Sequence, residues 1–508
     1  VDVPVLQAFG QKREAPLSLV QRRLWIAEQL SGGTSAYGMP MALRLRGELS
    51  IERLIGSFAA VVQRHEVLRT AYVQDDEGDP IALICEQVPV DFPLTDLSGL
   101  SRSAQEEHVA QAALDNVRTP IDLEQAPLWR GRILHLSATE HVLLFCMHHI
   151  ISDGWSMGVL VNELVQTYHL GEDPDTARLP ALDVQYSDFA LWQQALEQQG
   201  VLGQQGVYWK DQLAGYSGHL PLPTDNPRGL VPSFEGDSVQ FRLSAELTRA
   251  LRQHSTQAGV TLYSTLLASF QVLLHQVSGA ADVLVGADVA GREQPELERL
   301  IGFFVNVLPL RSRFDAAVPF ASFLANTQHT LLGALEHQDL PFDMIVDASG
   351  VARHKGMNPL VQVLFVMNNL PGRVQALGGL SVETLPVLES HSKFDMALFV
   401  DDEEGQLLGN WQFATTLFGH ERIQYLVKAW IALLEQIVAD QDIQLGAISM
   451  PVDNLAVAAK PAAPGPKADK LGKFLHESGH EHAYCTDHVF HLTASLAFGG
   501  KLLFGKLV

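Results

Sequence analysis

The sequence predicts an α/β protein built from two lobes of similar construction. Short apolar runs that suit strands alternate with amphipathic runs that suit helices in both halves of the chain. A polar, proline-containing stretch at 171–175 marks a break between the halves. The chain has 508 residues, 47% of them hydrophobic, which is enough for two cores and too much for one ordinary domain. We expect a first lobe over 1–180, a second lobe over 181–450, and a linker with a poorly assigned tail over 451–508.

In the first half, strands are expected at 41–45 and 142–150, and helices at 51–64 and 157–168. The run 142–147 is continuously apolar, as in a strand that is buried on both faces. Apolar residues then recur at helical spacing, with Ser152 or Asp153 available as the N-cap. The alternation of strand and helix therefore starts early in the chain.

The second half repeats this alternation. Strands are expected at 240–243, 282–289 and 362–367, with a helix at 262–276. The stretch 218–236 is rich in glycine and proline and is expected to be an exposed connection. From about Pro451 the pattern fails, and residues 458–466 (AAKPAAPGP) have the composition of a linker.

The most informative motif is HHxxxDG at 148–154, where the apolar strand gives way to a helix. Adjacent strand residues point to opposite faces, so His148 and His149 should have different roles. One histidine can face a cavity while the other is held in the packed interior. Imidazole is the side chain best suited to proton transfer near neutral pH. The motif therefore indicates a site for proton transfer.

Composition excludes several other classes of function. The net charge of −23 argues against general nucleic-acid binding and favours solubility. No run of 18 apolar residues exists, so no membrane span is expected. Three scattered cysteines are too few for a disulfide framework and fit the cytoplasm, and Cys146 is expected to be a buried thiol. The chain starts at Val1 without a signal peptide, which suggests a piece of a longer polypeptide.

Seven motifs, in order and spacing, resemble those of nonribosomal peptide synthetase condensation domains. They lie at 18–25 (SLVQRRLW), 64–72 (RHEVLRTAY), 148–154 (HHIISDG), 186–192 (YSDFALW), 301–307 (IGFFVNV), 337–343 (HQDLPFD) and, more loosely, 353–360 (RHKGMNPL). This chain departs from the family's motifs at a few positions, which are Val20, Arg22, Tyr72, Val307 and Asp343. The resemblance covers about residues 15–450.

The resemblance implies two lobes like chloramphenicol acetyltransferase, arranged as a V-shaped pseudodimer with a tunnel between them. It implies an acyltransferase of natural product biosynthesis that joins a donor acyl or peptidyl thioester to the amine of an acceptor aminoacyl thioester. Donor and acceptor carrier protein domains would present both substrates on 4'-phosphopantetheine arms, beside an adenylation domain. The domain itself is expected to bind no cofactor and no metal.

The resemblance also assigns roles to the residues of the HHxxxDG turn. His149 matches the family's catalytic histidine and is expected to bind the acceptor amine, either as a general base or as a positioning acceptor. Its neighbour His148 is expected to be structural. Gly154, at the start of a helix, is expected to let backbone approach the reacting carbonyl, with its N–H available to the oxyanion.

Asp153 is expected to be structural, because a carboxylate in a tight turn beside apolar residues needs a charged partner. Arg69, and as a second candidate Arg64, match the family's arginines that hold this loop by an ion pair. Trp155 and Asn306 are placed along the substrate tunnel. Trp155 is expected there more as packing against the loop than as a substrate contact.

One further motif indicates metal binding. Residues 476–480 read HExxH, and further candidate ligands follow at His482, Cys485, His488 and His491. On a helix, histidines four positions apart would share a face. Gly479 weakens such a helix, and only about 30 residues remain to build a site. We therefore expect no catalytic metal here.

Two classes of function remain open. The first is a condensing enzyme. The second is a non-catalytic relative that recruits another protein, although such a relative should have lost part of HHxxxDG, which this chain keeps. Within the enzyme class, the other motifs favour condensation over epimerization. Heterocyclization is disfavoured because that subfamily carries DxxxxD in place of the histidine pair. A starter domain that takes a fatty acyl donor stays open.

Overall fold

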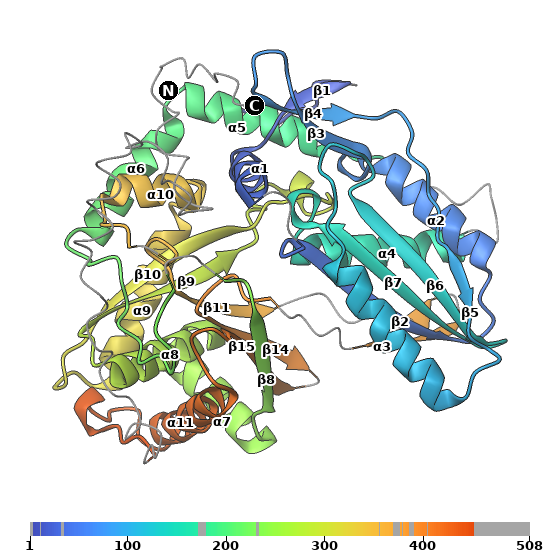
Figure 1. Cartoon of the computed structure of the whole chain (residues 1–508). Coiled ribbons are helices and arrows are strands. Elements are labelled where there is room, and N and C mark those ends of the chain that lie inside the picture. Colours follow the sequence, from blue (N-terminus) through green and yellow to red (C-terminus); the bar gives the residue numbers. More distant parts are fainter. Residues whose placement is uncertain are drawn as a thin grey trace, which may run out of the picture. The chain divides into compact units, whose positions relative to one another are not determined.

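The computed structural model describes residues 4–10, 12–31, 35–170, 179–229, 233–354, 356–368, 376–377, 379–385, 391–403 and 405–451. The chain forms two compact units (Figure 1). Unit 1 takes the chain up to Gln204 together with Val289–Asn306 and Asn369–Ser390. Unit 2 takes Gln205–Asp288, Val307–Asn368 and the chain from His391.

This division differs in two ways from the expected lobes 1–180 and 181–450. Helix α5 (Tyr186–Gln198) belongs to unit 1, because it packs against α1 (Leu19–Ser31) and β1 (Glu14–Pro16). Two later segments, Val289–Asn306 and Asn369–Ser390, also belong to unit 1. The expected break at 171–175 and the tail from 452 onward lie outside the described residues.

Unit 1 is built on a six-stranded mixed sheet in the order β12-β13-β2-β7-β6-β5. Its strands are β2 (Gly38–Arg46), β5 (Leu94–Asp96), β6 (Trp129–Ser137), β7 (Glu140–His148), β12 (Ala376–Leu377) and β13 (Leu380–Thr384). A small sheet, β1-β4-β3, adds β3 (Thr70–Gln74) and β4 (Pro80–Ile84). The principal helices are α1, α2 (Ile51–Arg64), α3 (Arg102–Arg118), α4 (Gly154–Leu170) and α5.

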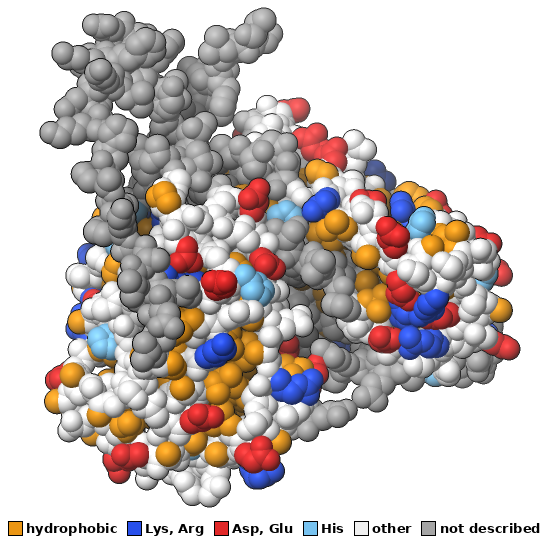
Figure 2. Space-filling view, turned by 60° about the horizontal axis from the view of Figure 1, so that its bottom comes forward, with side chains coloured by type: hydrophobic (Ala, Val, Ile, Leu, Met, Phe, Trp, Pro, Cys, Tyr) orange, Lys and Arg blue, Asp and Glu red, His pale blue; other side chains and the backbone are white. Residues whose placement is uncertain are grey.

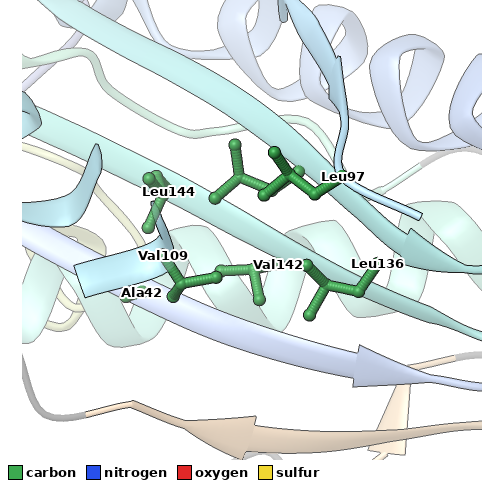
Figure 3. Close-up of a cluster of buried hydrophobic side chains, with 7 residues drawn as sticks. Ala42, Leu97, Val109, Leu136, Val142 and Leu144 are labelled. Carbon is green, nitrogen blue, oxygen red and sulfur yellow. The ribbon is translucent and has the colours of Figure 1, made fainter. Parts of the chain in front are cut away.

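The run 142–147 of strand β7 is continuously apolar because helices cover both faces of the sheet. On one face, Val142 and Leu144 pack with Val109 of α3 in a buried cluster (Figure 3). On the other face, the ring of Phe145 lies 5.3 Å from Phe58 of α2. Successive β7 side chains therefore enter two different cores, which is why no polar residue alternates with them.

At the HHxxxDG motif, two element boundaries differ from the sequence prediction. The strand expected to reach Ile150 ends at His148, because His149–Ile151 form a 3₁₀ turn closed by a hydrogen bond from Ser152 N–H to the His149 carbonyl (3.2 Å). Helix α4 begins at Gly154, three residues before the expected start, because the Asp153 carboxylate accepts the Ser156 N–H as an N-cap (2.8 Å). The predictions of α2 and of β9 (Asp282–Val289) are confirmed at both ends.

Unit 2 is built on a second six-stranded mixed sheet, in the order β10-β9-β11-β14-β15-β8. Its strands are β8 (Gly236–Arg242), β9, β10 (Asn306–Arg313), β11 (Val363–Asn368), β14 (Met396–Glu403) and β15 (Gln406–Ala414). Its helices are α7 (Ala245–Ala258), α8 (Leu262–Ser278), α9 (Phe320–Leu335), α10 (Phe342–Ser349) and α11 (His420–Ala439), and α6 (Val201–Leu213) begins in unit 1 and ends in unit 2.

Aromatic side chains join the unit 2 sheet to its helices. Phe270 of α8 lies 5.5 Å from Trp411 of β15 and 5.6 Å from Phe365 of β11. Trp430 of α11 donates its indole N–H to the hydroxyl of Ser269 (2.9 Å). The predicted α/β fold with two lobes of similar construction is therefore confirmed, and the V-shaped arrangement with a tunnel stays a prediction.

Acidic and basic side chains are both spread over the face of the molecule shown in Figure 2. Within unit 1, some of them form networks, as where Arg44 contacts Glu106 (2.6 Å) and Glu140 (3.4 Å). Among the described residues, no single helix is long and apolar enough to cross a membrane, and the bent pair Ala245–Ala258 and Leu262–Ser278 passes that test only jointly.

Candidate active site

His148 is the structural member of the histidine pair. It is the last residue of β7, and its side chain is 1% exposed. Its Nδ1 accepts the Ile150 N–H (3.1 Å), so the proton of the ring lies on Nε2, which donates to the Glu28 carboxylate (3.2 Å). The ring is thus neutral and fixed at both nitrogens, which leaves it a role in holding the turn.

His149 is half-buried and lies in the 3₁₀ turn that follows β7. Its backbone N–H donates to the Tyr37 carbonyl (2.8 Å). Its Nδ1 lies 2.7 Å from the Ser152 carbonyl oxygen, and because a carbonyl can only accept, Nδ1 carries the proton. In the neutral form of the ring, the lone pair therefore lies on Nε2. The ring also packs against Phe303, with centroids 4.7 Å apart and planes tilted by 58°.

Asp153 is buried and is paired with Arg292, not with Arg69 or Arg64. Nη2 of Arg292 lies 3.1 Å from Oδ1 and 3.3 Å from Oδ2, and the two side chains are 2% and 4% exposed. The expectation that Arg69 or Arg64 pairs with Asp153 is therefore wrong. Those two arginines lie on α2 and the turn after it, where Arg69 donates to the Cys85 carbonyl (2.5 Å) and Arg64 to Glu163 (2.9 Å).

One signal in the sequence could have identified Arg292, which is a cation three residues after the predicted buried strand 282–289. Gly291, with φ of +63°, turns the chain after β9, and a Cβ there would lie 2.2 Å from the Phe304 carbonyl oxygen. Arg292 then donates to the carbonyls of Leu297 (2.6 Å) and Leu300 (2.7 Å). Burial lowers the pKa of this guanidinium, and the Asp153 carboxylate opposes that shift.

The segment 297–304 is held against the HHxxxDG turn along its backbone. The Phe304 N–H donates to Asp153 Oδ2 (3.0 Å), and the Gly302 N–H donates to the Ser156 hydroxyl (3.0 Å). The Tyr186 hydroxyl donates to the Phe303 carbonyl (2.5 Å). Gly302 is required here, because a Cβ would lie 2.0 Å from the Tyr186 ring. The motif IGFFVN therefore belongs to the same site as HHxxxDG.

Motifs near the N-terminus also contact this site. Gln21 donates from Nε2 to the Ile150 carbonyl (2.8 Å) and to the Tyr72 hydroxyl (2.7 Å). His65 Nε2 donates to Glu163 (2.8 Å), and its Nδ1 accepts the Ile301 N–H (3.4 Å). Burial lowers the pKa of His65, which keeps this imidazole neutral. None of these contacts was predicted, since the motifs show which residues recur but not which atoms meet.

Of the remaining predicted residues, Gly154 and Trp155 follow Asp153 directly at the start of α4. Gly154 is exposed as the first residue of α4, and a Cβ added to it would meet no heavy atom within 4 Å. Trp155 donates its indole N–H to the Glu298 carbonyl (2.8 Å), so it packs against the 297–304 segment. Asn306 is buried at the start of β10. Among the described residues, no cluster of three or more metal-ligating side chains occurs, and HExxH at 476–480 lies outside them.

Two other motifs lie in unit 2. The carbonyl of His337 accepts the Trp209 indole N–H (2.9 Å), and the Asp339 carboxylate accepts from Gln205 (2.8 Å). Both contacts fix the HQDLPFD segment to α6. The buried side-chain carbonyl of Gln362 accepts the Leu220 N–H (3.0 Å), so the segment after the 353–360 motif is fixed as well.

Comparison with known proteins gives the family. The condensation domain model matches residues 11–455. The chain is 36% identical over 443 residues to one of the linear gramicidin synthase proteins of Brevibacillus parabrevis, a match that covers 86% of this chain and 9% of that protein. It is 37% identical over 445 residues to one of the plipastatin synthase proteins of Bacillus subtilis, a match that covers 87% of this chain and 17% of that protein. The chain thus spans less than a fifth of the length of these curated relatives.

Among solved structures, the fold is similar to that in the complex of the X-domain and OxyB from teicoplanin biosynthesis. The TM-score is 0.80 at 25% identity, over 89% of this chain and all of that one. Condensation domains of nonribosomal peptide synthetases are amide-bond-forming acyltransferases, and the resemblance carried by the seven motifs is confirmed. The chain belongs to the condensation domain family.

Proposed function

We propose that this chain forms an amide bond between a donor acyl or peptidyl thioester and the amine of an acceptor aminoacyl thioester. The amine nitrogen attacks the thioester carbonyl carbon, a C–N bond forms and the C–S bond breaks. The proton that the nitrogen loses ends on the leaving thiolate. A thioester needs little activation, so the main tasks of the protein are to position both reactants and to keep water away.

His149 receives the acceptor amine in this proposal. An α-amine has a pKa of about 7.7–8.0, so much of it must lose a proton before or during attack near neutral pH. The hydrogen bond from Nδ1 to the Ser152 carbonyl places the lone pair of the ring on Nε2, which can accept an amine N–H. This single observation carries the proposal, because it gives the imidazole the tautomer that either a general base or a positioning acceptor needs.

Gly154 receives the reacting carbonyl. Its exposed position at the first residue of α4 combines a backbone N–H at a helix start with open space on the Cβ side. A developing oxyanion is stabilised by such a donor. Asp153, with Arg292, and His148, with Glu28, act structurally by fixing the two ends of the turn that carries His149.

The substrates in this proposal are carried on 4'-phosphopantetheine arms of donor and acceptor carrier protein domains, next to an adenylation domain. Support comes from the curated relatives, which are synthetase proteins far longer than this chain. The arms would pass along a tunnel bordered by Trp155 and Asn306. We place the reaction in the cytoplasm, where the thiols of Cys85 and Cys146 stay reduced.

The proposal is tested by mixing the intact chain with two synthetic carrier proteins, one loaded with a donor aminoacyl group and one with an acceptor. Mass spectrometry should show a dipeptidyl group on the acceptor carrier. An N-acetylated acceptor is the matched control, because it lacks the attacking amine and should give no product. Product from the blocked acceptor would contradict amide formation at the α-amine.

A recruiting function is the alternative outcome. It gains support from the similarity to the X-domain, which was solved in complex with OxyB. The complete HHxxxDG turn, in which the His149 imidazole is hydrogen-bonded to the Ser152 carbonyl, argues against a recruiting function. If several donor and acceptor pairs give no product with a folded chain, the enzyme proposal fails and recruitment is favoured.

A further inference from the structure

The His149 imidazole makes a hydrogen bond at Nδ1 and packs against the ring of Phe303, and these two contacts restrain different motions of the imidazole. The bond from Nδ1 to the Ser152 carbonyl fixes one atom of the imidazole, and a hydrogen bond tolerates misalignment of some tens of degrees. The χ2 angle of histidine has broad wells, so the ring can still turn and carry Nε2 with it. The ring of Phe303 packs against the imidazole, with ring centroids 4.7 Å apart and planes tilted by 58°.

Phe303 is itself held by its neighbours in the chain. Gly302 before it is bound to Ser156 through its N–H (3.0 Å) and its carbonyl (2.8 Å). Phe304 after it is buried, donates its N–H to Asp153, and packs under the Arg292 guanidinium at 4.1 Å. The backbone on either side of Phe303 is therefore fixed to the turn that carries His149.

A chain of directed hydrogen bonds ends on the carbonyl of Phe303. The Tyr186 hydroxyl donates to that carbonyl (2.5 Å), so its remaining contact with the Ser18 hydroxyl (2.8 Å) must be one in which Ser18 donates. The Ser18 hydroxyl in turn accepts the Gln21 N–H (3.2 Å). Burial raises the pKa of Tyr186 well above its ordinary value, so the hydroxyl remains a donor.

We propose that Phe303 is a positioning residue for condensation, that its ring sets the plane of the His149 imidazole, and that Tyr186 and Ser18 set the place of Phe303. The inference rests on the proposed function of His149 and deepens it. Phe303 touches neither substrate nor product in this account. It acts by holding Nε2 where the acceptor amine arrives, and a small misplacement there lowers the rate of the bond-forming step.

The experiment measures kcat and KM for the acceptor carrier with four chains: the intact one, Phe303→Leu, Phe303→Tyr and Tyr186→Phe. Leucine keeps an apolar side chain but removes the aromatic face, and we expect kcat to fall about tenfold with KM changed by less than about twofold. Tyrosine restores an aromatic face and should restore kcat. Tyr186→Phe removes only the oxygen that binds the Phe303 carbonyl and should lower kcat about threefold.

A double variant separates positioning from general damage. If Tyr186 acts through Phe303, then Tyr186→Phe combined with Phe303→Leu should be no slower than Phe303→Leu alone. Multiplicative losses in the double variant, an unchanged kcat in Phe303→Leu, or a loss that tyrosine does not rescue would each overturn the proposal. Thermal unfolding of all variants shows whether each chain is folded, and Tyr186→Phe keeps the test open if Phe303→Leu does not fold.

Failure of this inference is distinguishable from failure of the proposed function. If the intact chain makes product and His149→Ala does not, while the Phe303 variants match the intact chain, only the positioning role is lost. If the intact chain makes no product, the proposed function fails and the positioning role fails with it.

Discussion

Arg292 and Asp153 form a buried ion pair across 3.1 Å, and this pair fixes the segment 297–304 to the HHxxxDG turn. The guanidinium donates hydrogen bonds to the Asp153 carboxylate, to the carbonyls of Leu297 and Leu300, and to the hydroxyl of Ser156. The carboxylate in turn caps α4 and accepts the Phe304 N–H. One pair therefore orders the helix start, the histidine turn and the segment that carries Phe303.

Substituting Arg292 with methionine should destabilise the chain strongly. The change leaves the Asp153 carboxylate buried without its countercharge, and loss of one partner of such a pair typically costs about 3–5 kcal/mol. Denaturant unfolding measures the free energy of unfolding. The control is Arg299→Met, which breaks an exposed pair with Asp183 and should cost at most about 1 kcal/mol. Equal losses in the two variants would refute the structural role of the Arg292–Asp153 pair.

The stability of the chain should fall as the pH drops below about 6.5, in part because of His65. Burial lowers the pKa of His65 in the folded state below its ordinary value of 6.5. The unfolded chain then binds the proton more readily, so stability from this group is complete above 6.5 and is lost as the pH falls toward the folded-state pKa. His65→Gln keeps a donor for Glu163 and does not titrate.

The measurement is the free energy of unfolding of both chains at pH 7.5 and pH 5.5. Because residue 65 titrates only in the intact chain, the intact chain should lose more stability than His65→Gln over this range. Other buried histidines titrate in both chains alike, so the difference between the chains isolates His65. Identical pH dependence would show that His65 is not held neutral in the folded chain.

Gly154→Ala should separate stability from catalysis. Alanine is the better helix former, and its Cβ meets no heavy atom within 4 Å, so thermal unfolding should be unchanged or occur slightly higher. If the reacting carbonyl approaches the backbone at this point, the added methyl group occupies the space it needs, and the rate of condensation should fall at least about tenfold. An unchanged rate would show that substrate does not approach this face of Gly154.

Local patterns in the sequence predicted much of the fold. The apolar run of β7 and the periodicity of α2 gave the elements on which the site is built, because burial on two faces or on one stripe leaves a clear signature. The turn after β7 was also predicted, although the strand was expected to end at Ile150, two positions later than its observed end at His148. Local signals of this kind depend only on neighbours in the chain.

Contacts between distant residues could not be derived in the same way. Long-range packing places Val289–Asn306 in unit 1 and pairs Arg292 with Asp153, and no local pattern in the sequence encodes it. Arg69 and Arg64 were chosen because they lie in a recurring motif, but their side chains meet Cys85 and Glu163 instead. A motif records which residue types recur and leaves their partners to the packing.

The central claim is that Nε2 of His149 receives the acceptor amine. It is tested most directly by the single-turnover rate of product formation with His149→Ala, beside His135→Ala, which removes a partly exposed histidine paired with Asp96. We expect the first variant, folded by thermal unfolding, to be at least about 100-fold slower than the intact chain, and the second to match it. A rate for His149→Ala within about twofold of the intact chain would contradict the claim.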